Sequence, residues 1–158
     1  MREAVRWGAF GASAAVVLLV GLTAGVAQDK LAMVTQRQDF MKAQGTDVKA
    51  IADYSKGQGD QAKAAAAIDD LIARNPKIEA QFVPGTSSKD FPDKSKAKPE
   101  LWTDMAKVKE IPAALLVEEQ KVKAAIASGD QKAVADAVGS MGKNGCGSCH
   151  GTYREKTT

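Results

Sequence analysis

Apolar residues recur along most of this chain at three- and four-residue steps, and runs of β-branched residues with a period of two are missing. This spacing predicts amphipathic helices. The first covers about residues 29–56, and one of its faces carries Val34, Met41, Val48 and the small residues Gly45 and Ala52. A break at 57–60 follows, and Asp60 is suited to cap a second helix over about 61–82. Asn75-Pro76 predicts a kink or an end and restart within it.

The second half of the chain predicts two more helices after a polar connection. Residues 83–98 are rich in Pro, Gly and Ser, which indicates a long crossover rather than a tight turn. A third helix is predicted from Pro99 to about residue 127, with Pro112 bending it. Residues 128–130 end that helix, and Asp130 is predicted to cap a fourth. Four apolar faces joined by two short turns and one long connection predict an all-α fold, an antiparallel four-helix bundle.

The N-terminus has the pattern of an export signal. Arg2 and Arg6 precede an uncharged run over residues 7–28, and Gly25-Val26-Ala27 supplies the small residues of a cleavage site. We therefore expect residues 1–27 to be a signal peptide and residues 28–158 to form one domain. An uncleaved membrane anchor is the alternative, because the uncharged run is about long enough to span a bilayer. Both interpretations place the domain outside the cytoplasm, most simply in a bacterial periplasm.

The chain has only two cysteines and one histidine, and all three lie in the run Cys146-Gly147-Ser148-Cys149-His150. A Cys-x-x-Cys-His run predicts attachment of a c-type haem. Each thiol can add to one vinyl group of a porphyrin, and His150 can then be the proximal iron ligand. A dithiol redox site, a structural disulfide and half a zinc site are alternatives. No strand signal surrounds the motif, and the chain has no further Cys or His to complete a zinc site.

Charge narrows the range of partners. After residue 27 the chain has 20 basic and 18 acidic residues, and two haem propionates would bring its net charge near zero. Because nucleic-acid-binding domains carry a strongly basic surface, nucleic acid is not an expected partner. Glycines at 139, 142, 145 and 147 weaken the fourth helix relative to alanine. Close approach of the backbone to a flat porphyrin and a frayed C-terminal helix both remain open as explanations.

The C-terminal run from Cys146 to Lys156 resembles the class II c-type cytochromes, which comprise cytochrome c′ and low-spin relatives such as cytochrome c-556. Most other c-type cytochromes carry the motif near the N-terminus. The resemblance extends over essentially the whole domain, and the upstream segments that carry it are Arg37-Gln38-Asp39-Phe40-Met41-Lys42, Ser55-Lys56-Gly57-Gln58, Phe82-Val83-Pro84-Gly85-Thr86 and Pro99-Glu100-Leu101-Trp102. Pro112 and Gly151 depart from the family pattern.

The resemblance implies a four-helix bundle with one haem c near one end, attached through the last helix. It assigns the thioether bonds to Cys146 and Cys149 and the proximal ligand to His150. Met41 falls at the first-helix position that faces the distal side of the iron. Two further residues fall where the family places basic side chains near the haem, namely Arg37 and Arg154.

The environment of these arginines is open at this point. Arg37 can form a salt link to a propionate or be a solvated surface residue. If the fourth helix continues through the motif, Tyr153 and Arg154 follow His150 at three- and four-residue spacing.

The role of Met41 decides the expected function. If its sulfur binds iron, the haem is six-coordinate and low-spin, and the protein is a one-electron carrier rather than an enzyme. If Met41 only packs over the porphyrin, a five-coordinate cytochrome c′ that binds nitric oxide or carbon monoxide is expected. Two short segments resemble the low-spin group, namely Phe40-Met41-Lys42 and Cys146-Gly147-Ser148-Cys149. We therefore favour the electron carrier. A haem enzyme such as a peroxidase needs a distal acid–base group, and the chain has no second histidine.

The carrier interpretation implies transient contact with redox partner proteins at the haem edge, aided by Lys143, Arg154 and Lys156. The family also contains dimers, so a homodimer is compatible with the resemblance. Contact with a membrane is expected only if the N-terminal segment stays uncleaved.

Overall fold

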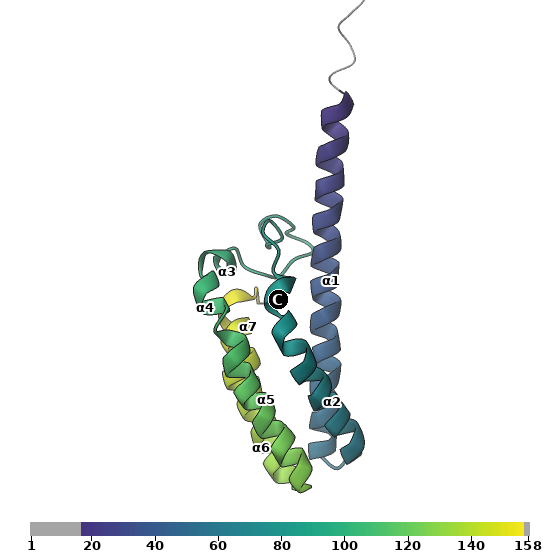
Figure 1. Cartoon of the computed structure of the whole chain (residues 1–158), viewed down its shortest axis with the longest axis vertical. Helices are drawn as coiled ribbons and strands as arrows, with labels where there is room; N and C mark the ends of the chain where they lie inside the picture. The colour runs from purple at the N-terminus through teal and green to yellow at the C-terminus, as the bar shows by residue number, and fades with distance from the viewer. Residues whose placement is uncertain (1–16, 157–158) are drawn as a thin grey trace, which may run out of the picture.

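The computed structural model describes residues 17–156 and arranges them as an all-α bundle (Figure 1). Four helical rods form the bundle. The last rod passes from an α-helix to a π-helix and back to an α-helix. The elements in chain order are α1 (Val17–Ser55), α2 (Gln61–Arg74), the 3₁₀ turns η1 (Asn75–Lys77) and η2 (Glu79–Gln81), α3 (Glu100–Thr103), α4 (Met105–Val108), α5 (Ile111–Ser128), α6 (Gln131–Ser140), the π-helical segment η3 (Met141–Cys146) and α7 (Gly147–Tyr153). The predicted four-helix bundle is confirmed.

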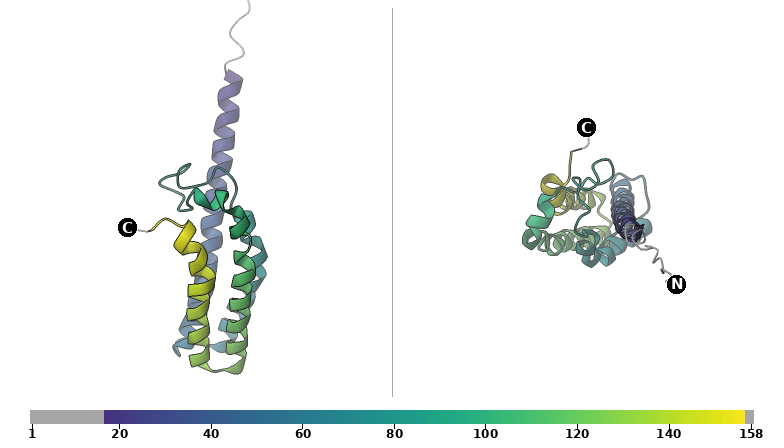
Figure 2. Two further views of the ribbon diagram at one scale, coloured as in Figure 1. Left: turned by 90° about the vertical axis from the view of Figure 1, so that its left-hand side faces the viewer. Right: turned by 90° about the horizontal axis from the view of Figure 1, so that it is seen from above.

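Consecutive rods run antiparallel and surround one core. α1 packs against α2 and α6, and α5 packs against the same two helices, so the four rods lie at the corners of a square (Figure 2). The short connections 56–60 and 129–130 lie at one end of the bundle. The long connection between α2 and α5 lies at the other end, together with α7 and the C-terminus (Figure 1). This arrangement places the Cys-x-x-Cys-His motif at the end that the long connection covers.

Both predicted helix caps are present. The side chain of Asp60 accepts a hydrogen bond from the Lys63 amide at 2.8 Å, and Asp130 accepts from the amides of Lys132 and Ala133. These bonds satisfy amides that have no partner within the first turn of a helix. Gly129, the residue before Asp130, ends α5 with a φ of 74°, a left-handed conformation that glycine adopts without strain.

Small and branched side chains fill the middle of the bundle. α2 buries one face at helical spacing, with Ala64, Ala67, Ile68 and Leu71. Ile51 of α1, Val122 of α5 and Val134 of α6 are each fully buried against this face. Burying one such branched side chain stabilises a fold by about 1.5–3 kcal/mol. The core thus holds together the four helices α1, α2, α5 and α6.

The third predicted helix is wrong as one continuous element. The chain forms two short helices, α3 and α4, and the long helix begins only at Ile111. Pro112 lies in the first turn of α5 and does not bend a helix from within. The reason is that proline has no amide hydrogen to donate and its ring fixes φ, which suits it to a first turn. Pro99 likewise lies one position earlier than expected, as the residue preceding α3.

The N-terminal prediction is not tested. Most of the predicted signal peptide, residues 1–27, lies outside the described residues, and cleavage before Gln28 stays a prediction. Among residues 17–156, no helix is both long enough and apolar enough to cross a membrane.

Candidate functional site

Two adjoining cavities lie beside the motif, at the end of the bundle where the long connection runs. They have volumes of about 380 Å³ and 240 Å³. Both are lined by the same four side chains, Met41, Phe82, Cys149 and His150. The first cavity opens toward the loop at residues 95–97, and the second reaches into the core. Together they form one concave site between α1, α5 and α7.

The wall that carries the motif is a continuous helix with one wide turn. η3 ends at Cys146, and α7 carries Cys149 and His150. Gly145 is buried, and a Cβ atom there would lie 2.6 Å from Cδ1 of Leu115 on α5. Such a distance is shorter than real side chains tolerate, so glycine allows this helix to approach α5 closely. The frayed-helix explanation is therefore wrong, and for Gly145 the close approach is to Leu115.

The π-helical turn explains another glycine, Gly147, which lies within the motif. A Cβ at Gly147 would lie 2.7 Å from the carbonyl oxygen of Gly142, within the π-helical winding itself. Gly139 and Gly142 face open space and have no such requirement. π-helical turns inside α-helices often occur at functional sites, where they displace the residues that follow. Here the wide turn immediately precedes Gly147 and Cys149.

The surroundings of the motif shift the pKa values of its three ionisable side chains. Desolvation raises the pKa of the Cys146 thiol, and the nearby charge of Glu119 raises it further; desolvation likewise raises the pKa of Cys149. A redox-active dithiol would need a lowered thiol pKa, so the environment argues against a thioredoxin-like site. Desolvation lowers the pKa of His150, and the positive charge of Arg154 lowers it further. His150 is therefore a neutral imidazole at neutral pH, which is the form that binds metals.

α1 contributes the facing wall through Met41. Met41 is half-buried and lines both cavities, and its Sδ accepts a hydrogen bond from Nε2 of Gln44 at 3.5 Å. Met33 is exposed and Met105 belongs to a separate apolar cluster, and neither lines these cavities. Met141 lines only the second cavity, from η3, in the same helical rod as His150. Met41 is thus the methionine that faces His150 from another helix.

Arg37 is a buried cation one turn before Met41. Its Nη1 donates to Oγ1 of Thr86 at 2.8 Å, and its Nη2 donates to the Thr86 carbonyl at 2.8 Å and to Oγ of Ser95 at 3.0 Å. The guanidinium also lies 5.5 Å from the centre of the Phe82 ring. Only 5% of the residue is exposed, so the solvated-surface alternative is wrong. Within residues 17–156 no carboxylate pairs with Arg37, and desolvation lowers its pKa.

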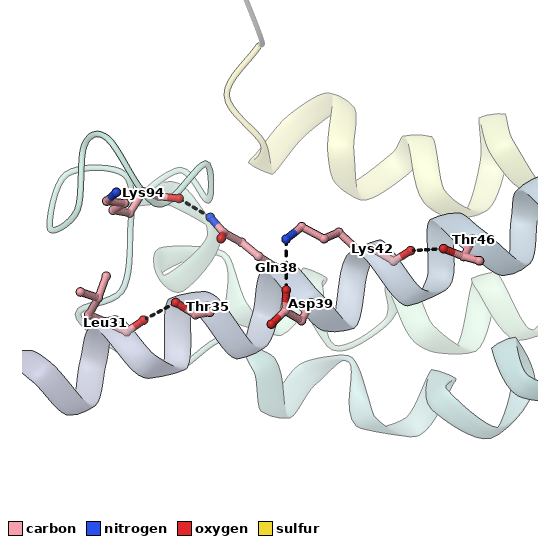
Figure 3. A network of polar contacts seen from close by, with 7 residues as sticks. All are labelled: Leu31, Thr35, Gln38, Asp39, Lys42, Thr46 and Lys94. Carbon is pink, nitrogen blue, oxygen red and sulfur yellow. Dashed lines mark hydrogen bonds and ion pairs between the residues drawn. The ribbon is translucent and has the colours of Figure 1, made fainter.

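Polar contacts along α1 fasten the long connection over the site. Figure 3 shows Gln38, which donates to the carbonyl oxygen of Lys94 at 2.5 Å. On the next turn Lys42 pairs with Asp39 at 3.1 Å along the helix surface. The loop at residues 83–98 is thereby held against the same helix that presents Arg37 and Met41.

The C-terminal segment closes the first cavity. α7 ends at Tyr153, and Arg154 follows in an extended conformation whose backbone pairs with Ala97 of the loop. The helix thus continues through the motif as far as Tyr153, which keeps the helical spacing from His150, but Arg154 lies just beyond the helix end and its side chain lines the first cavity. Tyr153 is buried, and its hydroxyl donates to Oδ2 of Asp104 at 3.2 Å.

The structure brings all six predicted site residues to the two cavities. Arg37, Met41, Cys149, His150 and Arg154 line the first, and Cys146 lines the second. The site fits a haem on three counts. Its cavities are mostly apolar and of cofactor size. Two thiols and an imidazole lie on one helix, and a buried arginine without a carboxylate partner lines the first cavity.

The lining also includes residues that the sequence did not indicate as part of the site, among them Gln44, Phe82 and Glu119. Glu119 is the clearest case, because it is only 1% exposed and lines the second cavity. A signal was present, since Glu119 occupies the position between Leu115 and Val122 in the apolar series of α5. An acidic residue at a core position indicates either a buried polar contact or a functional group.

Comparison with known proteins agrees with this geometry. The family model described as Cytochrome C' matches residues 32–154. A cytochrome c-556 from Agrobacterium tumefaciens (strain II Chrys) is 35% identical over 125 residues, covering 78% of this chain and 97% of that protein.

Solved structures show the same fold. A cytochrome c' from Rhodobacter Spheriodes superimposes with a TM-score of 0.72 at 26% identity, covering 81% of this chain and 98% of that one. A ferrous variant of cytochrome c prime from Alcaligenes xylosoxidans with bound NO superimposes with a TM-score of 0.64 at 28% identity, covering 79% and 94%.

Proposed function

Because the chain belongs to the cytochrome c′ family, we propose that it is a periplasmic one-electron carrier whose single haem c is ligated by His150 and Met41. The family binds haem covalently, and Cys146 and Cys149 are the two thiols of this chain that can hold it. When bound, the haem supplies an iron that gains or loses one electron. In this proposal the protein carries electrons and catalyses no reaction of its own.

One observation carries the choice of ligands. Met41 on α1 and His150 on α7 line both cavities, so a thioether and an imidazole from two different helices are available to a group that fills this site, which supports the proposed ligation. The hydrogen bond from Gln44 restricts where the Met41 sulfur can point. A sulfur has a second lone pair that this bond leaves free, so the contact is compatible with iron binding. A thioether ligand stabilises the reduced iron and raises its potential.

The remaining site residues hold and shield the haem. Arg37, already fixed by Thr86 and Ser95, offers its positive charge to a propionate without losing side-chain freedom. Tyr153 and the loop at 95–97 restrict water on the open side of the first cavity. Arg154 is exposed at this rim and supplies a charge for docking. Docking of this kind suits brief encounters with redox partners, because rim charges raise association rates more than affinity.

The alternative function is a five-coordinate cytochrome c′ that binds nitric oxide or carbon monoxide. The NO-bound structure from Alcaligenes xylosoxidans, which shares this fold at 28% identity, favours considering it. In that case Met41 would pack beside the porphyrin as an apolar residue, which is the commonest role of a core methionine.

Optical spectra separate the two functions. We expect the wild-type protein to be low-spin in both oxidation states and to bind carbon monoxide poorly. Met41→Leu keeps the side-chain volume but removes the sulfur, and we expect it to become high-spin and to bind the gas readily. Met141→Leu is the matched control, because Met141 is fully buried and lines the second cavity beside the same motif. A wild-type protein that is already high-spin and binds the gas at once would contradict the proposal.

A further inference from the structure

A carboxyl group lies in the wall of the second cavity, where the lining is otherwise largely apolar. Glu119 of α5 is 1% exposed and lines the same cavity as Met41, Cys146 and His150. Its Oε2 accepts a hydrogen bond from Nδ2 of Asn75 at 2.9 Å, and the same Asn75 nitrogen donates to the Pro112 carbonyl at 3.0 Å. Asn75 is buried as well, so one amide fixes the carboxyl group in a place that solvent does not reach.

The positive charges around Glu119 are all engaged elsewhere or exposed. On α5 itself, Glu118 pairs with Lys121 and accepts from Ser140, and Lys123 pairs with Asp69 of α2. Arg74, at the end of α2, pairs with Asp47 of α1 and with Asp70. The other charged or titratable groups on the surrounding elements are exposed, or belong to the motif: Lys63, Lys77, Lys107, Lys132, Asp136, Lys143, Cys146, Cys149 and His150. Within residues 17–156, no cation pairs with Glu119.

Burial makes the charged form of this group unfavourable. Desolvation raises the pKa of Glu119, and the hydrogen bond from Asn75 offsets only part of that rise. Glu119 and Cys146 line the same cavity, so the carboxyl lies close to the motif. The negative charge of Glu119 in turn raises the pKa of Cys146. In the haem-bound protein the sulfur of Cys146 belongs to a thioether and does not titrate. Glu119 is then the acidic side chain that lines the second cavity.

We propose that Glu119, held by Asn75, is a proton-binding site that takes up one proton from solvent when the haem gains one electron. The inference rests on the proposed electron-carrier function. The electron comes from the redox partner, the proton forms an O–H bond with one carboxylate oxygen of Glu119, and no bond breaks. The net charge of the site is then unchanged by reduction. Oxidation reverses both transfers.

Electrostatics supplies the physical reason. An added electron makes the haem more negative, and a carboxylate within the same low-dielectric cavity is repelled by that charge. Proton uptake removes the repulsion, so proton binding and electron binding favour one another. The reduction potential must then fall as the pH rises, over the interval between the proton affinities of Glu119 in the oxidised and reduced protein. The limiting slope is about 59 mV per pH unit, the value for a tenfold change in a one-electron equilibrium.

The test measures the reduction potential of the haem-bound protein against pH in the wild type, in Glu119→Gln and in Glu118→Gln. Glutamine keeps the size of the side chain and removes the titration. Glu118 is the neighbouring buried carboxyl, but it pairs with Lys121 and lines neither cavity, which makes it the matched control. We expect a sloping interval in the wild type and in Glu118→Gln, and its loss in Glu119→Gln. We expect Glu119→Gln to retain the higher potential that the wild type reaches at low pH.

A second readout follows the proton itself. Infrared difference spectra of reduced minus oxidised protein should contain the C=O stretch of a newly protonated carboxyl, which Glu119→Gln lacks and Glu118→Gln retains. Equal pH dependence in wild type and Glu119→Gln, or a band that survives Glu119→Gln, would overturn the proton site. Spin state is read from the same samples. A high-spin spectrum contradicts the proposed ligation, while the titration still decides the role of Glu119.

Discussion

Gly145 offers the sharpest test of how the motif is positioned. Replacing it with alanine adds one methyl group at a point where the ideal Cβ would lie 2.6 Å from Cδ1 of Leu115. Leu115 is itself buried, but its side chain lines the second cavity and can turn toward that space. Either Leu115 turns into the volume that the haem would occupy, or η3 moves away from α5. The first response disturbs the haem site, and the second disturbs the segment that ends at Cys146.

The size of the effect follows from two opposing contributions. Extra volume in a well-packed core costs about 1–3 kcal/mol. Alanine is favoured over glycine in a helix by roughly 0.5–1 kcal/mol, which offsets part of that cost. Gly142 lies in the same π-helical segment but faces open space, so Gly142→Ala gains the second contribution without the first. The free energy of unfolding of Gly145→Ala should therefore lie about 1–3 kcal/mol below that of Gly142→Ala.

Guanidinium unfolding of both haem-bound variants, followed by far-ultraviolet circular dichroism, measures this difference. The absorption spectrum reports separately whether the haem environment has changed, and we expect a change only in Gly145→Ala. Equal stability of the two alanine variants, with unchanged spectra, would show that the close approach of η3 to α5 is not a constraint.

Three further predictions concern other side chains of the site. Arg37→Lys loses the fork that bonds Thr86 and Ser95, and we expect a loss of about 3 kcal/mol in unfolding free energy, whereas Gln38→Ala loses a single exposed bond and should cost about 1 kcal/mol or less. Gln44→Leu removes the donor to Met41, and a bond of about 1 kcal/mol predicts a roughly fivefold rise in the ratio of high-spin to low-spin haem, read from the absorption spectrum. Glu119→Gln should be more stable than the wild type at neutral pH, because the raised pKa of Glu119 makes folding increasingly unfavourable as pH rises from the unfolded-state pKa through the folded-state pKa. That advantage should vanish in acid, and a pH-independent difference would contradict it.

The sequence predicts the architecture well because the apolar series and the caps are local features. Asp60 and Asp130 cap the helices that their positions suggest, since a cap depends only on the amides of the next few residues. The error at Pro112 has a local cause too. An apolar series at helical spacing runs through residues 102–126, but spacing cannot tell one bent helix from short helices followed by a long one that begins at the proline.

The site residues show where sequence reasoning stops. Three residues of one motif predict the cofactor. The buried environment of Arg37 could not be predicted in this way, because Thr86 and Ser95 reach it from a loop about fifty residues away. Glu119 was visible as an acidic residue in an apolar series, yet only the tertiary structure places it beside Cys146 and Asn75. The glycines were visible in the sequence, but only the structure shows the wide turn of η3 and the close contact of Gly145 with Leu115 on α5.

The proposed electron carrier requires the Met41 sulfur to bind the iron together with His150. X-ray absorption at the iron edge of the haem-bound protein tests it most directly, because sulfur and nitrogen ligands are distinguishable by distance and scattering strength. We predict one sulfur in the first coordination shell of the wild type, absent from Met41→Leu and retained in Met141→Leu. A wild-type spectrum with only nitrogen ligands, unchanged in Met41→Leu, would contradict the account and favour the gas-binding alternative.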